Sequence, residues 1–259
     1  MESVTPAPSP SSPGVLPELL PLQANASAPV DFSAGALVLL DKPEGKSSFW
    51  LVRQLRRITG VRTIGHGGTL DPFATGLMVL LVGKSATRQQ DRVMHGDKGY
   101  RALLRLGVTS DSHDRTGQID VVCDAATAPF DTARLHEVLA GFRGPQLQVP
   151  PMFSAIKQGG ERLYRKARRG EDVVRAPRAV TIHRLEVLSW NWPLLELDIL
   201  CSKGTYIRSL ASDLGRELGT GALVQELRRT SSGDFSLDQV LDLDTVERLA
   251  GRTPGESPA

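Results

Sequence analysis

The chain has few cysteines, few aromatic side chains and no long apolar run. No apolar run reaches the roughly 18 residues that a membrane-spanning helix needs. The N-terminus lacks the basic region and apolar block of a secretory signal. The two cysteines lie far apart, outside any CxxC pattern, which excludes a disulfide framework and a structural zinc site. We therefore expect a cytoplasmic protein without a membrane anchor.

Motifs that define several common enzyme classes are missing as well. The sequence contains no P-loop, no GxGxxG, no HExxH and no nucleophile elbow. These absences argue against P-loop phosphoryl transfer, dinucleotide redox chemistry, zinc proteolysis and serine hydrolysis. We expect a site that uses neither a metal nor a redox cofactor.

What is present is the composition of one globular domain with a basic surface. The 259 residues are 40% apolar and 23% charged, and the formal net charge is +2. The first 34 residues contain three acidic residues and no Lys or Arg. Lys and Arg are enriched in two tracts, residues 42–105 and 157–178. Two basic tracts suit a polyanionic partner such as nucleic acid.

The N-terminal segment has the composition of a disordered tail. Residues 1–33 contain seven of the seventeen prolines, with Ser and Ala filling much of the rest. Such a segment cannot bury enough apolar surface to offset its ordering entropy. We predict a disordered tail over residues 1–34, one folded domain over 35–250 and a short polar tail over 251–259.

The most constrained stretch is GHGGTLDPFATG, residues 65–76, with Asp71 near its centre. Its four glycines and one proline exclude the interior of a helix or strand. The apolar run at 77–83 follows directly and predicts a buried strand. Asp71 therefore lies on a rigid loop that leads into the core, where a carboxylate serves either turn chemistry or catalysis.

The remaining pattern interleaves strands, hairpins and helices without strict βα alternation, which predicts an α+β domain on a mixed, largely antiparallel sheet flanked by helices. A hairpin is expected at 109–120, where His113 and Asp114 read as solvent-exposed turn residues rather than a metal pair. Lys42, in the turn after the first strand, reads as a solvated lysine or a phosphate contact. The other strands are predicted at 36–40, 98–107, 179–188 and 194–200, with a last strand or strand-helix segment at 222–230. Helices are predicted at about 48–59, 85–94, 131–142, 207–219 and 238–250.

Three side chains suggest the chemistry. An ionised Asp71 in a desolvated pocket needs a cation, and Arg208, at a strand-to-helix junction, is the candidate. Tyr100, near the start of a strand, can stack on a base and still present a phenol for proton transfer. Together they describe a site that acts on a nucleobase or its glycosidic bond.

With these residues in place, the sequence resembles a known family, the bacterial tRNA pseudouridine-55 synthases of the TruB type. The resemblance runs from about Gly35 to Leu249. The blocks that carry it are DKPEGKSS, GHGGTLDPFATG, KGYRALLRLG, the VPPMFSAIK tract and CSKGTYIRSLASDLG, in the family's order and approximate spacing.

The resemblance implies the pseudouridine synthase fold, with residues 35–250 as the catalytic domain, and isomerisation of uridine 55 in the T-loop of tRNA. It implies that Asp71 is the essential carboxylate, Tyr100 the active-site tyrosine and Arg208 the partner of Asp71. It also implies that Lys42 and Pro43 are structural. Substrate-binding residues implied by the resemblance are His66, Tyr206 and Leu227 around the flipped nucleotide, and Lys157, Arg165, Lys166, Arg168 and Arg169 in an RNA-binding insertion at 157–178, here called the thumb.

The implied reaction breaks the N1–C1′ bond of the uridine and rejoins the ring through C5. Nothing is oxidised or reduced, so no cofactor is expected. The expected partner is the T-arm stem-loop of tRNA, bound by a monomer, and the chain leaves no room for the C-terminal PUA-type domain of many relatives. Two alternatives stay open, a non-catalytic tRNA-binding or folding factor that uses the same surface, and a glycosylase that releases the free base.

Overall fold

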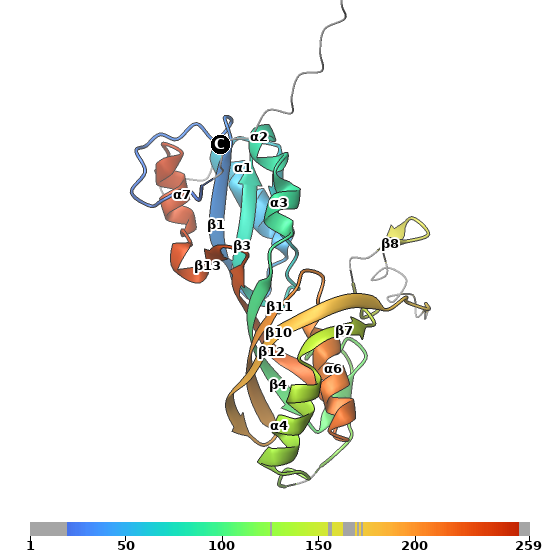
Figure 1. Ribbon diagram of the computed structural model, residues 1–259. Helices are drawn as coiled ribbons and strands as arrows, with labels where there is room; N and C mark the ends of the chain where they lie inside the picture. Colours follow the sequence, from blue (N-terminus) through green and yellow to red (C-terminus); the bar gives the residue numbers. More distant parts are fainter. Residues whose placement is uncertain are drawn as a thin grey trace, which may run out of the picture.

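The computed structural model describes residues 20–124, 126–154, 157–162, 169, 171 and 173–253. Within these residues, nine strands form one sheet in the order β1–β3–β12–β4–β11–β10–β7, with β2 paired to β3 and β13 paired to β12 (Figure 1). Every pairing in it is antiparallel except that of β12 with β3. The strands are β1 (Ala36–Lys42), β2 (Ile64–His66), β3 (Thr75–Val82), β4 (Lys98–Leu106), β7 (Gly144–Gln148), β10 (Arg178–Asn191), β11 (Leu194–Cys201), β12 (Ala222–Ser232) and β13 (Phe235–Ser236).

Short helices flank this sheet, which confirms the predicted α+β class with a mixed, largely antiparallel sheet. No helix in the described part of the chain is long and apolar enough to cross a membrane. The helices are α1 (Ser48–Thr59), α2 (Lys84–Thr87), α3 (Gln90–Met94), α4 (Thr132–Gly141), α6 (Ile207–Glu217) and α7 (Leu243–Leu249), with a 3₁₀ turn η1 (Leu237–Gln239).

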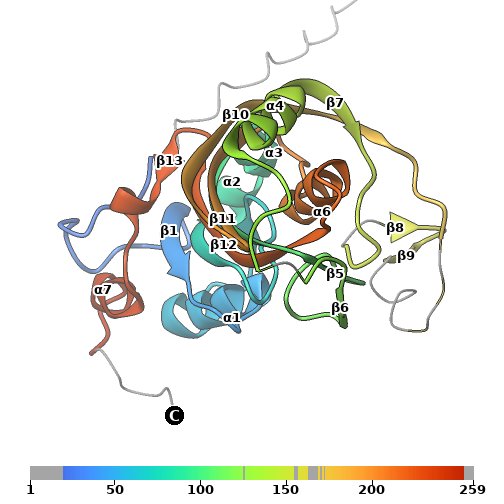
Figure 2. The ribbon, with the colours of Figure 1, turned by 90° about the horizontal axis from the view of Figure 1, so that it is seen from below.

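Two hairpins lie outside the main sheet. The pair β5 (Val108–Ser110) and β6 (Ile119–Val121) confirms the hairpin predicted at 109–120. The pair β8 (Lys157–Gln158) and β9 (Glu161–Arg162) belongs to the thumb and lies at the periphery of the molecule (Figure 2).

Helix α1 shows how the local sequence sets an element. The Ser47 side chain accepts a hydrogen bond from the Trp50 amide at 3.2 Å, which caps the helix N-terminus. Gly60 then adopts a left-handed φ of 71° and ends the helix. Both signals were visible in the sequence, and the predicted range is confirmed.

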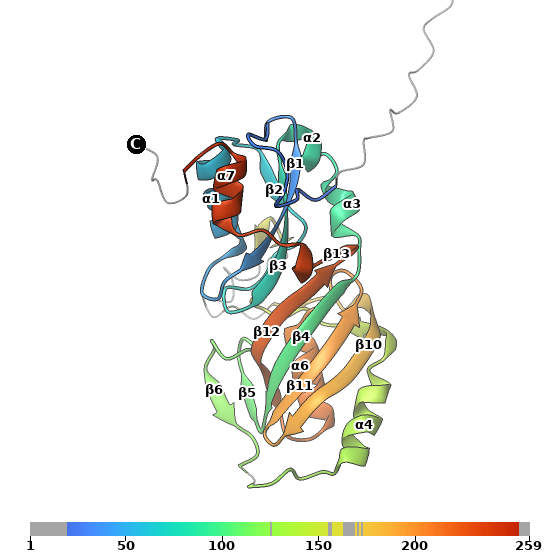
Figure 3. The same ribbon diagram turned by 90° about the vertical axis from the view of Figure 1, so that its left-hand side faces the viewer.

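The side chains of strand β4 alternate between a covered face and an open face of the sheet. Tyr100, Ala102 and Leu104 are buried on one side, whereas Arg101 and Arg105 are exposed on the other. Helix α6 lies against the covered face, and the sheet curves around it (Figure 2). Figure 3 shows the open face, with α6 behind the strands. Residues of β4 that alternate in step with Tyr100 therefore face the interior of the domain.

The prediction of a disordered tail up to residue 34 is wrong for residues 20–34. The Leu22 amide donates to the Leu37 carbonyl at 2.8 Å, and the Val30 amide donates to the Leu249 carbonyl at 2.7 Å. The Phe32 side chain is buried, with 3% exposed. The segment covers the outer edge of β1 and contacts α7, because a few apolar anchors suffice where a sheet edge offers backbone partners. Residues 1–19, and 254–259 of the predicted polar tail, lie outside the described residues.

Two helix predictions need correction. Residues 85–94 form two short helices, since the Gln89 amide bonds to the Ala86 carbonyl at 2.9 Å in a tight turn that interrupts the helical register. The closing helix begins at Leu243 rather than at 238. Its start is delayed because the Leu241 amide donates to the Leu39 carbonyl at 2.8 Å, beside β1, and Asp242 caps the helix that follows.

Candidate active site

The loop that carries Asp71 connects β2 to β3 and is held at several points by its backbone. The Leu70 amide donates to the Ser48 hydroxyl at 2.8 Å, and this hydroxyl donates to the Leu70 carbonyl at 3.0 Å. The Gly45 amide donates to the Pro72 carbonyl at 2.9 Å. The loop is therefore fixed against the start of α1, which agrees with the rigid loop predicted from the sequence. The Asp71 side chain keeps 36% of its surface exposed.

Glycines in this loop allow a close approach of neighbouring elements. A Cβ atom at Gly67 would lie 2.7 Å from Cγ1 of Val93, so any larger residue there would need this valine to move. Gly76 has a φ of +106°, and a Cβ atom there would lie 2.3 Å from the Arg229 carbonyl oxygen. The loop thus packs directly onto α3 and β12.

Arg208 lies in the first turn of α6 and reaches Asp71 with two nitrogens. Its Nε lies 2.9 Å from Oδ2 of Asp71, and its Nη2 donates to Oδ1 at 3.2 Å. This side-on, two-point contact fixes the carboxylate in one orientation. The two residues are 137 positions apart in the sequence, and the structure brings them together as expected.

The Arg208 guanidinium is itself immobilised, with only 5% of its side chain exposed. Nη1 donates to the Ser112 carbonyl at 3.0 Å, and Nη2 donates to the Phe153 carbonyl at 2.7 Å. A second carboxylate, Asp114, lies 3.5 Å from Nη1. Arg208 therefore stands between two carboxylates and two backbone acceptors.

Asp114 was read from the sequence as an exposed turn residue, which is wrong, since only 3% of it is exposed. Its carboxylate accepts hydrogen bonds from the Ser112 hydroxyl at 2.8 Å and from the Thr116 amide at 2.9 Å. Such local donors satisfy the oxygens of a buried carboxylate without solvent. The missed signal is the Ser112, Asp114 and Thr116 spacing, which closes a turn around the acid. His113, beside it, is half-buried.

The electrostatics of Asp71 reflect competing effects. Burial raises the pKa of the Asp71 carboxyl, and the Arg208 guanidinium opposes this shift. Asp114 adds a further upward contribution to this pKa, whereas Lys42 lowers it. The carboxylate form of Asp71 therefore depends on the cations around it.

Lys42 is one of these cations, and the expectation of a solvated lysine is wrong. Its side chain is completely buried, and Nζ donates to the carbonyls of Pro43 at 2.9 Å, Lys46 at 2.6 Å and Pro72 at 3.2 Å. Burial lowers its pKa to about 8. Lys42 thus ties the turn after β1 to the residue that follows Asp71, which agrees with the structural role that the resemblance implied.

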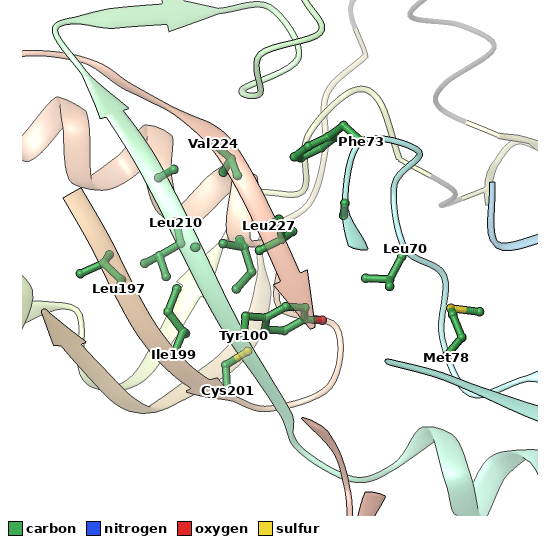
Figure 4. Packing of buried hydrophobic residues seen from close by; sticks show 14 of the residues in the cluster. Leu70, Phe73, Met78, Tyr100, Leu197, Ile199, Cys201, Leu210, Val224 and Leu227 are labelled. Carbon is green, nitrogen blue, oxygen red and sulfur yellow. The ribbon is translucent and has the colours of Figure 1, made fainter. Parts of the chain in front are cut away.

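Tyr100 and Leu227 lie on the covered face of the sheet, close to the loop. Leu227 on β12 pairs with Ala102 on β4, two residues from Tyr100 and on the same face. Figure 4 shows the Tyr100 ring beside β12, with its oxygen directed toward Leu70 and Met78. Both side chains are at least nine-tenths buried. Burial raises the pKa of the Tyr100 phenol.

His66 and Tyr206 border the same region from two other elements. His66 lies on β2, half-buried, and its Nδ1 accepts a hydrogen bond from the Gly68 amide at 3.3 Å. Burial and the nearby Arg229 charge lower the pKa of His66, which favours a neutral imidazole. Tyr206 precedes α6, and its amide donates to Oε1 of Gln148 at 2.8 Å.

The structure says less about the thumb. Arg165, Lys166 and Arg168 lie outside the described residues, and only the backbone of Lys157, in β8, is described. Arg169 is exposed and forms ion pairs with Glu161 at 2.7 Å and Glu171 at 2.7 Å. Exposed pairs of this kind are weak, about 0–1 kcal/mol, so they leave Arg169 free to exchange them for a phosphate.

The arrangement can hold an ionised, oriented carboxylate beside a buried phenol and an apolar wall formed by Leu227. Such a site can act on a base or sugar whose nucleotide has left the stack. Arg229, which the sequence analysis did not identify, lies behind the site, where it donates hydrogen bonds to the carbonyls of Gly68 and Leu77. The alternation of side chains along a strand could have identified it, because Arg229 follows Leu227 by two residues and therefore lies on the same face of the sheet.

Comparisons with known proteins agree with this geometry. The family model described as TruB family pseudouridylate synthase (N terminal domain) matches residues 56–207. The model described as tRNA pseudouridylate synthase B C-terminal domain matches residues 208–256. The border between the two models falls inside α6, whose neighbour β12 belongs to the central sheet, so it does not divide the sheet into separate units.

Similar proteins carry the same description. The protein named tRNA pseudouridine synthase B of Protochlamydia amoebophila (strain UWE25) is 48% identical over 88% of this chain and 86% of its own length. Its namesake from Chlamydia felis (strain Fe/C-56) is 47% identical over 82% of this chain and 88% of its own length. Among solved structures, one chain of a Cbf5–Nop10–Gar1 complex is 29% identical, with a TM-score of 0.60 over 80% of this chain and 51% of that chain.

Proposed function

Because this chain belongs to the TruB family of tRNA pseudouridine synthases, which are isomerases that act on tRNA, we propose that it converts uridine 55 in the T-loop to pseudouridine. The observation that carries this proposal is the two-point ion pair of Asp71 with Arg208 at 2.9 and 3.2 Å, on a loop fixed to the core. A rigid, oriented carboxylate with an exposed edge is the group that the reaction requires.

The reaction is an isomerisation that conserves every atom. The N1–C1′ bond breaks, the uracil ring turns, and C5 joins C1′. The proton on C5 then leaves and N1 gains one, so charge balances and no oxidant or reductant takes part. The residues must therefore hold the ring, supply one carboxylate and move one proton.

In this proposal Asp71 is the essential carboxylate, acting on the sugar or the ring. More than a third of its side chain is exposed, so a nucleotide can reach it, whereas its partner Arg208 is buried. Arg208 keeps the carboxylate ionised and aimed, which opposes the effect of burial. Opening the base stack costs a few kcal/mol and is offset by contacts in the site.

Tyr100 and Leu227 form the part of the site that holds the base. Both lie on the face of β4 and β12 that is turned toward the loop. A phenol ring can stack on uracil and assist removal of the C5 proton through its oxygen. Leu227 offers an apolar surface to the ring. Tyr206 and His66, which border the site, would contact the same nucleotide.

An unmodified tRNA transcript tests the proposal. Incubation with the protein, followed by carbodiimide mapping of pseudouridine, should reveal one modified position in the T-loop. Asp71→Asn should abolish modification and change the Kd for tRNA by no more than tenfold, ~1.4 kcal/mol. Asp213→Asn is the matched control, because Asp213 also pairs with an arginine of α6, at 2.6 Å, but that arginine, Arg216, is exposed whereas Arg208 is buried.

The outcomes distinguish the proposed isomerase from the two alternative functions. Binding without modification by the wild-type protein indicates a tRNA-binding factor, and an abasic product indicates a glycosylase. Turnover by Asp71→Asn at a tenth of the wild-type rate would assign the chemistry to another group.

The T-arm itself is proposed as the recognised element, since a stem-loop presents unstacked bases that a protein reads well. An isolated T-arm stem-loop should be modified with a kcat/KM within roughly tenfold of that for full-length tRNA. A much stronger preference for the full-length molecule would place recognition outside the T-arm.

A further inference from the structure

Arg229 is a buried cation that the roles described above leave unexplained. Only 2% of it is exposed, although arginine is among the residues that proteins bury least. It lies on β12 directly opposite Tyr100 on β4. Opposite residues of an antiparallel pair have Cβ atoms about 5 Å apart on the same face, so the two side chains meet.

The guanidinium connects Tyr100 to the loop of Asp71. Nε donates to the Leu77 carbonyl at 2.8 Å, and Nη2 donates to the Gly68 carbonyl at 3.2 Å. Nη2 also lies 3.2 Å from the sulfur of Met78. Figure 4 shows the Tyr100 oxygen pointing toward Met78, the side on which Arg229 contacts the loop. The guanidinium lies close enough to the phenol for its charge to lower the pKa of Tyr100 against the effect of burial, as the cross-strand pairing of the two residues requires.

Within the described part of the chain, no carboxylate balances the Arg229 charge. Its titratable neighbours include His66 and Lys98, and the Arg229 charge adds to burial in lowering the pKa of each, for Lys98 to about 8. Tyr100 is the partner that can carry a negative charge toward it. An unpaired buried cation is costly, and the fold retains one here.

We propose that Arg229 is a positioning residue that fixes the Tyr100 oxygen relative to the Asp71 loop and stabilises negative charge on that oxygen. This inference rests on the proposed function, because it assigns a purpose to Tyr100 in that reaction. Arg229 acts through Tyr100 and does not touch the nucleotide.

The groups around Tyr100 make the expected direction clear. Burial raises the pKa of the phenol, and Arg229 provides the largest opposing effect. Cys201 on β11 and Asp71 on the loop both raise this pKa further. Removing the Arg229 charge should therefore raise the pKa of Tyr100 and disfavour the phenolate.

The chain has only three tyrosines, which permits a direct measurement. Biosynthetic 3-fluorotyrosine should give three ¹⁹F resonances, assigned with Tyr100→Phe and Tyr164→Phe. Titration then follows Tyr100 in the wild type, in Arg229→Met and in Arg229→Lys. We expect the Tyr100 pKa to rise by at least about one unit in Arg229→Met, while that of Tyr206, on another element, stays constant.

Single-turnover modification of tRNA provides the second readout. Arg229→Met should slow the rate at least tenfold at neutral pH while the Kd for tRNA stays within about twofold. Arg228→Met is the matched control, since it removes the same charge from the next residue, whose side chain is 40% exposed on the opposite face and pairs with Asp41. In this control the Tyr100 pKa should stay at its wild-type value, and the single-turnover rate should stay within twofold of the wild-type rate.

If Arg229→Met does not fold, the Tyr100 pKa and the single-turnover rate of Arg229→Lys test the inference. A lysine keeps the charge but cannot reach Gly68, Leu77 and Tyr100 together, so the Tyr100 pKa should rise less and the rate should recover only in part. An unchanged or lowered Tyr100 pKa, or no titration of Tyr100 in either protein, overturns the inference. The titration needs no activity, so it stays decisive even if the wild-type protein modifies no tRNA, a result that would refute only the proposed function.

Discussion

Replacing Arg208 with lysine tests whether the geometry of the Asp71 pair, rather than its charge alone, supports catalysis. Arg208 contacts Asp71 through two nitrogens and also donates to the carbonyls of Ser112 and Phe153. A lysine ammonium is a point charge that cannot reproduce this planar fork. It would hold Asp71 through one contact at most and leave a carbonyl acceptor unpaired.

The expected loss follows from these contacts. An unsatisfied buried acceptor costs about 1–3 kcal/mol, and the lost second contact to the carboxylate adds about 1 kcal/mol. If about 3 kcal/mol of this is lost from the transition state, the single-turnover rate falls by roughly a hundredfold. Arg216→Lys, on the exposed side of the same helix and paired with Asp213 at 2.6 Å, should change the rate by less than about twofold.

The pH dependence supplies a second readout for the same variant. Burial raises the pKa of Asp71, and Arg208 opposes that shift. A weaker partner therefore raises the pKa further, so less Asp71 is ionised at a given pH, and the acidic limb of the rate profile moves to higher pH. Rapid-quench measurement of tRNA modification across the acidic range would show this shift. An unchanged rate, or a limb that moves to lower pH, would refute the reasoning.

Three further predictions concern stability and binding. The pKa of Lys42 is lowered, chiefly by burial, to about 8, so the unfolded chain holds an extra proton between that pH and its own pKa. The unfolding free energy of the wild type minus that of Lys42→Met should therefore rise by on the order of 3 kcal/mol as pH increases through this window. Denaturant unfolding measures both values, and a difference that stays constant or falls would contradict the prediction. Phe32→Ala should cost about 3 kcal/mol of unfolding free energy, against less than about 1 kcal/mol for the 52%-exposed Phe49→Ala, and equal losses would mean that residues 20–34 do not stabilise the domain. Charge reversal at Arg165, Lys166, Arg168 and Arg169 should weaken tRNA binding and lower the salt slope by about 0.7–0.9 per lost phosphate contact, and an unchanged slope would exclude the thumb from binding.

The sequence predicted the fold well where local signals and the buried pattern agree. Helix α1 carries both a serine cap and a terminal glycine, and β4 alternates strictly between buried and exposed residues. The pattern failed where partners distant in sequence decide the outcome. Residues 20–34 look disordered by composition, but the free edge of β1 gives their backbone hydrogen bonds. The start of α7 was placed too early because Leu241 bonds to Leu39 instead of continuing a helix.

The site divides in the same way. Asp71 could be selected from the sequence because glycine and proline mark a constrained loop, and its pairing with Arg208 followed from the need of a desolvated carboxylate for a cation. Asp114 and Lys42 could not be placed correctly, since burial of a charged side chain depends on acceptors that only the fold assembles. For Lys42 those acceptors are three carbonyls, one of them 30 positions away.

Three buried cations from separate elements fix the loop that carries Asp71. Lys42 at the end of β1 holds the Pro72 carbonyl, Arg229 on β12 holds those of Gly68 and Leu77, and Arg208 on α6 holds the carboxylate itself. Carboxylates lie near two of these cations: Asp71 and Asp114 beside Arg208, and Asp71, Glu44 and Asp41 near enough to raise the pKa of Lys42. Two of the three cations, Arg208 and Lys42, lower the pKa of Asp71 against the effect of burial and so favour its ionised form. The cations that hold the loop rigid thus also help to keep its carboxylate ionised.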